Sequence, residues 1–176
     1  LGTAFVSSLS GDIKEQLNRS ELMLAQFVTE KSIEIIKCYA SVMQQTLFDA
    51  VKDRRLETKI ETIRESAVEK IVQTGFFSAL ERIPEQISTV APRNIRRAVQ
   101  GSSTTLGAHL LAVFLLGSES ELIELQKSDP TFIDFVANLI RLRGHGNKHQ
   151  SDFSRDDMES LKSNVFKAIK IITEVF

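Results

Sequence analysis

Apolar residues in the first half of the chain recur at steps of mostly three, four and seven, the spacing of one helix face. Residues 12–74 contain no Gly or Pro and are rich in Glu, Lys, Gln, Ala and Leu, which favour helices. The charged residues 52–55 mark the expected turn between two long helices, and a single bent helix is the alternative. The apolar stripe consists of Leu24, Val28, Ile35, Tyr39, Val42, Leu47, Val51, Leu56, Ile60, Ile63, Ala67 and Ile71.

The second half predicts shorter helices. Residues 84–92 lie between two prolines and are expected to form a connector, followed by a short helix. The turn at residues 101–105 precedes an apolar helix at 106–116, and Gly117 ends that helix. No stretch alternates with the period of two that is typical of strands. The pattern therefore predicts an all-α protein, a helical bundle with antiparallel neighbours.

A helix–loop–helix is predicted between residues 129 and 157. Asp129 is a good N-cap and Pro130 is favourable at a first helical position, so a helix is expected to begin there. It should end at Gly144 and Gly146, because glycine can take the left-handed backbone angles of a helix C-terminus. Ser154 and Asp157 resemble a capping box, which predicts the start of a last helix.

Length and charge limit the classes of function. The 176 residues are enough for one domain, with a long-helix scaffold and dimerisation part at 1–83 and a second part at 84–176. The chain begins with Leu1 rather than Met, so we expect it to be part of a longer protein. Its formal net charge of −1 argues against a general polyanion-binding surface, and RNA binding would need a local basic site.

The sequence also bears on location. Cys38 is the single cysteine, which excludes an internal disulfide and fits a reducing, cytoplasmic environment. The most apolar run, 106–116, is too short to span a membrane, and no signal peptide is visible, so we expect no membrane partner. A phosphate-binding loop of Walker type is absent, which disfavours an NTPase.

The densest chemistry lies between Arg143 and His149. A histidine has an unperturbed pKa near ~6.5 and can take or give a proton at neutral pH. An arginine stays charged and grips two phosphate oxygens through its planar fork. Together they suit transphosphorylation of RNA, in which the imidazole accepts the proton of a ribose 2′-hydroxyl and the guanidinium stabilises charge on the phosphate. Such a mechanism needs no metal or other cofactor.

An Arg, five residues and a His between the last two helices of an α-bundle resemble the motif of the HEPN superfamily (higher eukaryotes and prokaryotes nucleotide-binding). The resemblance covers mainly residues 106–176. It implies a metal-independent endoribonuclease of a toxin–antitoxin or antiviral system. It also implies a homodimer with one composite site, an RNA substrate, and a protein partner such as an antitoxin.

The same resemblance implies the catalytic residues. Arg143 and His149 match the two motif positions, and His145 is a neighbouring candidate. Family members commonly carry Asn directly after the Arg; Gly144 stands there in this chain, and Asn147 is the candidate for the missing amide. The candidates for binding the RNA backbone are Arg141, Lys148, Arg93, Arg96 and Arg97.

Each of these features also has a simpler interpretation. Arg143 at a helix C-terminus is favourable against the helix dipole, and the arginines at 93–97 are most simply a solvated face. His145 and His149 are four residues apart, but the intervening glycine and the lack of a nearby cysteine disfavour a metal site. His109 is expected to be a hydrogen-bonded histidine of the core or of an interface.

Two further classes of function remain open. The long helices of the first half could present a coiled-coil-like surface that dimerises or holds a partner, which would make the chain a non-catalytic module regulating a larger protein. A nucleotide-binding or sensor domain attached to another catalytic unit is the third class.

Overall fold

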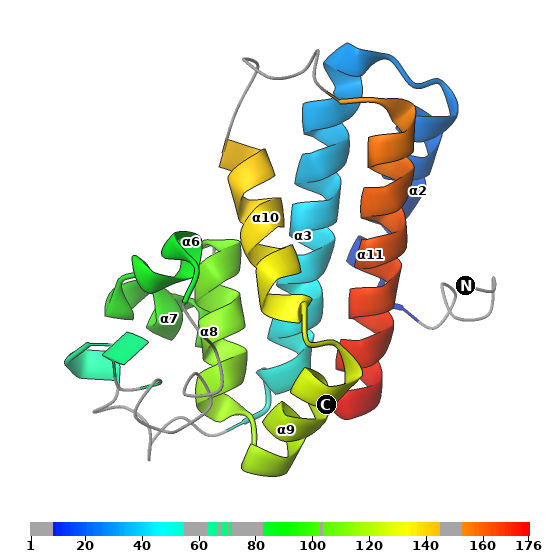
Figure 1. The fold of residues 1–176 in the computed structure, drawn as a ribbon. Coiled ribbons are helices and arrows are strands. Elements are labelled where there is room, and N and C mark those ends of the chain that lie inside the picture. The colour runs from blue at the N-terminus through cyan, green and yellow to red at the C-terminus, as the bar shows by residue number, and fades with distance from the viewer. Residues whose placement is uncertain are drawn as a thin grey trace.

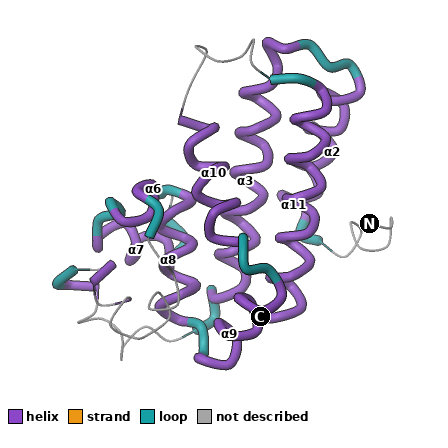
Figure 2. The backbone as a smooth tube through the Cα atoms, in the orientation of Figure 1, coloured by secondary structure: helices purple, strands orange, loops and turns teal. Residues whose placement is uncertain are grey.

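The computed structural model describes residues 9–54, 63–66, 68–69, 71, 83–102, 104–144 and 153–176. Within these residues every regular element is a helix, which confirms the all-α prediction (Figures 1 and 2). The elements are α2 (Gly11–Ala25), the 3-10 turn η1 (Thr29–Lys31), α3 (Ser32–Val51), α6 (Glu85–Ser88), α7 (Pro92–Val99), α8 (Leu106–Leu116), α9 (Glu119–Ser128), α10 (Phe132–Gly144) and α11 (Arg155–Val175).

Helix α3 is the centre of the bundle. It contacts α2, α8, α10 and α11, and Figure 1 shows it between α10 and α11. Its apolar residues point into these contacts, and Ile35, Ile36 and Tyr39 are completely buried. Burial raises the pKa of Tyr39 to about 12, so the ring belongs to the core. The molecule therefore has one core, built around the most apolar long helix of the first half.

Residues 12–51, whose composition favours helix almost throughout, are interrupted at residues 26–31. There the chain leaves α2, passes through an extended Val28 (φ −129°, ψ 141°) and forms η1. The break lets α2 fold back on α3 and bury Leu17 and Leu24, which are both 2% exposed. Tertiary burial thus outweighs local helix propensity. The predicted turn at 52–55 is confirmed at its start, because α3 ends at Val51.

This arrangement bears on the predicted dimerisation part. The apolar stripes of α2 and α3 are covered by other helices of the same chain. They therefore give no support to a coiled-coil surface between two copies. The stripe predicted after residue 55 lies mostly outside the described residues.

Several helix ends agree with the sequence. Helix α8 has the predicted bounds, and the Thr105 hydroxyl caps it by accepting from Ala108 N. Helix α10 ends at Gly144, the first of the two glycines expected to stop it, although the φ of Gly144 is not left-handed, and Gly146 lies outside the described residues. The helix begins at Phe132, two residues after Pro130. The reason is that Asp129 Oδ1 accepts from Thr131 N at 3.0 Å, in a turn before the helix. The connector predicted at 84–92 contains the one-turn helix α6.

The start of α11 carries the predicted capping box. Ser154 Oγ accepts from Asp157 N at 3.1 Å, and Asp157 Oδ2 accepts from Ser154 N at 2.8 Å. These bonds lower the pKa of the Asp157 carboxyl. The capping box therefore fixes the N-terminus of α11, the first helix after Arg143 in the chain.

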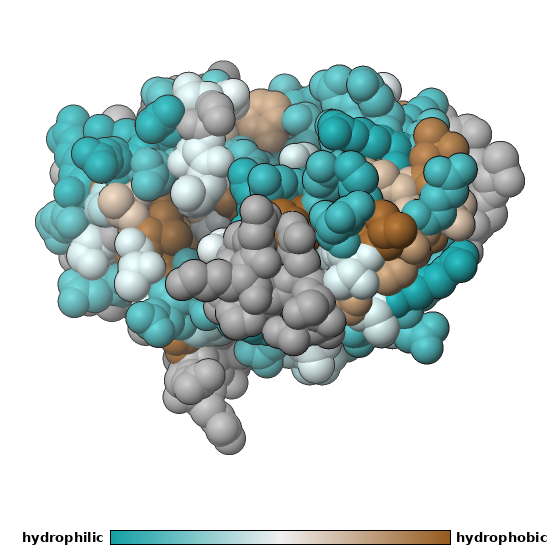
Figure 3. Space-filling view, turned by 90° about the horizontal axis from the view of Figure 1, so that it is seen from above, coloured by the Kyte–Doolittle hydropathy of each residue, from teal (hydrophilic) through white to brown (hydrophobic). Residues whose placement is uncertain are grey.

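The end of the bundle where α10 stops and α11 begins is seen from above in Figure 3. Most of its described surface is hydrophilic, with hydrophobic residues in small separate patches. None of the helices in the described part of the chain is long and apolar enough to cross a membrane.

Candidate functional site

Arg143 lies in the last turn of α10, and its side chain is exposed. Phe132, Val136 and Leu139 lie earlier on the same face of α10, at helical spacing from Arg143, and are at most 1% exposed. The helix therefore presents Arg143 from a fixed support. The other predicted catalytic residues, which are His145, Asn147 and His149, lie outside the described residues, as does Lys148.

Arg141 also lies on α10 and is exposed. Its guanidinium donates to Asn138 Oδ1, at 2.8 Å from Nη2 and 3.3 Å from Nε. Asn138 is one turn earlier on the same helix. The Arg141 side chain is thus directed back along α10.

A polar cavity of about 420 Å³ opens beside Arg143. Its volume lies in the range of small-molecule sites, roughly 300–1,000 Å³. Three parts of the chain meet there: one face of α3, the turn between α7 and α8, and the first turn of α8. The lining residues are Ser41, Gln44, Gln45, Phe48, Gly101, Ser102, Thr104, His109 and Arg143.

The α3 wall of the cavity carries two glutamines. Gln44 Nε2 donates to the Thr104 carbonyl at 2.9 Å, which joins α3 to the α7–α8 turn. Gln45 Nε2 donates to Asp49 Oδ1 at 2.9 Å. Each amide uses one N–H in this way and keeps a second N–H and its carbonyl oxygen. The wall therefore has fixed side chains with hydrogen-bonding capacity to spare.

His109 lies at the back of this cavity and is 5% exposed. Its Nδ1 is 3.1 Å from the Thr105 carbonyl, and because a carbonyl only accepts, Nδ1 carries the hydrogen. Burial lowers the pKa of His109 below its usual 6.5, against a smaller opposite effect of the Thr105 bond. The ring is therefore neutral at pH 7, with Nε2 as an acceptor. The prediction of a hydrogen-bonded core histidine is confirmed, and His109 lines the cavity as well.

Gly101 in the α7–α8 turn packs closely against Phe48 of α3. Gly101 has φ +78°, a conformation that residues with a side chain rarely adopt, and an added Cβ would lie 3.1 Å from Phe48 Cζ. The Phe48 ring in turn meets His109 edge-on, with ring centroids 6.3 Å apart. Among the described residues nothing hydrogen-bonds the buried Thr104 Oγ1. The turn thus contains a buried hydroxyl for which the described residues supply no partner.

The predicted short helix with three arginines is present as α7. Arg93 and Arg97 are exposed, and Arg96 is partly buried. The Arg97 carbonyl accepts from Ser102 N at 2.9 Å, so α7 runs directly into the turn that lines the cavity. Contact of these arginines with RNA remains a prediction.

Sequence reasoning missed Gln44, Gln45 and Thr104. A signal was present, because Ser41, Gln44 and Gln45 are polar residues at helical spacing in α3, beside its buried apolar stripe. No group of three His, Cys, Asp or Glu that could hold a metal ion occurs in the part of the chain that is described.

Comparison with known proteins gives no relative: no family model, no curated protein and no solved structure matches this chain.

Proposed function

We propose that the chain is a metal-independent endoribonuclease. In this proposal Arg143 binds the scissile phosphate and His149 accepts the proton of the neighbouring 2′-hydroxyl. The observation that carries it is the position of Arg143, exposed at the end of α10 and on the wall of a polar cavity. Among the described lining residues Arg143 is the one cation and the others are uncharged, which suits a strand that brings one phosphate at a time.

The reaction balances without a metal. The 2′-oxygen attacks phosphorus as its proton passes to His149, and the bond between phosphorus and the 5′-oxygen breaks. The products are a 2′,3′-cyclic phosphate and a 5′-hydroxyl, whose leaving oxygen takes its proton from solvent. Arg143 stabilises the negative charge that builds on the phosphate in the transition state.

The composite site implied by the family resemblance needs a second copy of the chain. The proposed homodimer brings two motifs together at the end of the bundle where α10 stops. Light scattering at micromolar concentration should then report twice the 19.7 kDa chain mass. A monomer throughout that range would contradict the composite site.

A nuclease assay in EDTA tests the proposal. Single-stranded RNA should be cut and DNA left intact, because DNA lacks the attacking hydroxyl. His149→Ala should lower the rate by ~10²–10⁴, the usual contribution of a positioned acid or base. Arg143→Lys should also lower it, since an ammonium cannot reproduce a two-point grip. His145→Ala should have a smaller effect, and Lys170→Ala, exposed on α11, is the matched surface control.

The competing function is that of an interaction module. RNA cleavage that persists in both the Arg143 and the His149 variants would overturn the ribonuclease proposal. The chain would then be a helical domain that binds a partner protein.

A further inference from the structure

The cavity beside Arg143 has features that phosphate binding alone does not use. We propose that it is a nucleobase subsite, which holds one base of the RNA while Arg143 holds the adjoining phosphate. This inference rests on the proposed ribonuclease function and names the part of the substrate that the site reads.

The glutamines supply the first argument. Gln44 and Gln45 each donate one N–H to a protein acceptor, Thr104 O and Asp49 Oδ1, and these bonds fix the two amides. The remaining N–H and carbonyl oxygen of each amide form a donor beside an acceptor. Base edges present the complementary pairs, and proteins read unpaired bases through such hydrogen bonds.

His109 supplies the second argument, since it is one of the residues that line the cavity. Because its Nδ1 already donates to Thr105 O, neutral His109 offers Nε2 as an acceptor. An N–H group on the edge of a bound base can donate to this acceptor.

Size and charge identify the occupant. The cavity of about 420 Å³ is much larger than a phosphate ion needs, and among the described residues that line it only Arg143 is charged. The other lining groups are amides, hydroxyls, the neutral imidazole and the Phe48 ring. An occupant with one anionic group and a larger, uncharged polar part fits this lining, and a nucleotide has that composition.

Calorimetric titration with defined probes tests the subsite. The probes are AMP, GMP, CMP and UMP as 5′-monophosphates, with ribose 5-phosphate and inorganic phosphate as probes that lack a base. At least one nucleotide should bind about 10-fold more tightly than ribose 5-phosphate. Gln45→Ala should remove about 10-fold of that affinity without changing ribose 5-phosphate binding. Arg143→Ala should weaken every probe.

Two further variants sharpen the comparison. Gln44→Ala should act like Gln45→Ala, but it also removes the bond to Thr104 O. The thermal midpoint of the Gln44→Ala variant must therefore be measured together with its affinity. If that variant is unfolded, the Gln45→Ala variant alone tests the subsite. Gln26→Ala, exposed at the end of α2, is the matched control and should change nothing.

The outcomes separate the two proposals. Nucleotides that bind no better than ribose 5-phosphate, or whose preference survives the Gln45 substitution, overturn the subsite even if RNA is cut. A glutamine-dependent preference for a nucleotide in a protein that does not cut RNA supports the subsite and overturns the ribonuclease proposal.

Discussion

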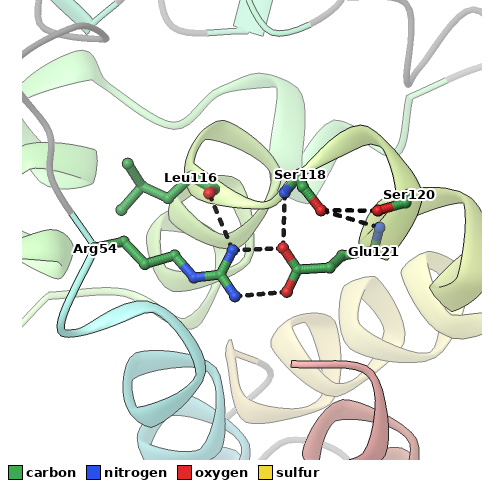
Figure 4. Close-up of polar contacts among 5 residues, drawn as sticks. All are labelled: Arg54, Leu116, Ser118, Ser120 and Glu121. Atoms are coloured by element: carbon green, nitrogen blue, oxygen red, sulfur yellow. Dashed lines mark hydrogen bonds and ion pairs between the residues drawn. The ribbon is translucent and has the colours of Figure 1, made fainter.

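The side chains of Arg54 and Glu121 form a two-point ion pair although they are 67 positions apart in the chain. The distances are 2.5 Å from Nη1 to Oε1 and 2.5 Å from Nη2 to Oε2 (Figure 4). Glu121 also accepts from Ser118 N in the capping box of α9. The pair therefore joins the turn after α3 to the start of α9, and the Arg54 guanidinium also lies 5.5 Å from the centre of the Phe176 ring.

Removing either partner should destabilise the protein. Arg54→Ala should lower the free energy of unfolding by about 1–2 kcal/mol, since charge-assisted hydrogen bonds are lost and solvent screening reduces their contribution. The double variant with Glu121→Gln should lose less than the two single losses added together, as measured by urea denaturation. Lys31→Ala removes an exposed pair with Glu34 and should change stability by less than about 0.5 kcal/mol. Additive losses would mean that the pair is not coupled.

The same pair should respond to acid. The Arg54 hydrogen bonds hold the pKa of Glu121 at about 2, below its usual 4.5. Because the pKa is lower in the folded protein, the stabilisation is complete above about 4.5 and is lost as the pH falls toward 2. The stability difference between the natural chain and Arg54→Ala should therefore shrink over that range.

The stability of the protein should also depend on pH through His109, over a different pH range. Burial lowers the pKa of His109 below 6.5 in the folded protein, so the unfolded chain binds the proton more readily. Stability should therefore fall as the pH decreases below about 6.5, and it should be fully regained above that value. Thermal denaturation at pH 7.5 and 5.5 measures the change. His109→Asn should reduce this pH dependence, and an unchanged dependence would contradict the assignment.

Gly101 should tolerate substitution poorly. Gly101→Ala forces a side chain into φ +78° and brings a methyl group against Phe48, so we expect a loss of about 1–2 kcal/mol. Gly11 provides the comparison, because it begins α2 and a Cβ there would meet nothing within 4 Å. Gly11→Ala should leave stability unchanged or raise it by up to about 1 kcal/mol. Equal effects of the two substitutions in urea denaturation would refute the constraint at Gly101.

The helix ends that the sequence predicts well are those with local signals. Thr105 and Gly117 lie at the two ends of α8, and Ser154 caps α11 together with Asp157, three residues later in the sequence. No Gly or Pro marks the break after Ala25 in the sequence. It depends on the burial of Leu17 and Leu24 against α3, which only the assembled bundle supplies.

The candidate site likewise has one part that local sequence signals predict and another that they do not. Gly144 predicts that Arg143 ends a helix, and the structure agrees. The cavity beside Arg143 was not predicted, because its walls come from α3, the α7–α8 turn and α8, which are far apart in sequence. Its chemistry depends on tertiary contacts such as the bond from Gln44 to Thr104.

The ends of the cut RNA test the central claim most directly. An RNA oligonucleotide incubated with the protein in EDTA should yield 2′,3′-cyclic phosphate and 5′-hydroxyl ends, identified by mass spectrometry. The same oligonucleotide with 2′-deoxyribose at the cut position should stay intact there, and Arg143→Ala should give no product above background. Ends with 5′-phosphate, cleavage at the deoxy position, or full activity of Arg143→Ala would each contradict the proposed ribonuclease.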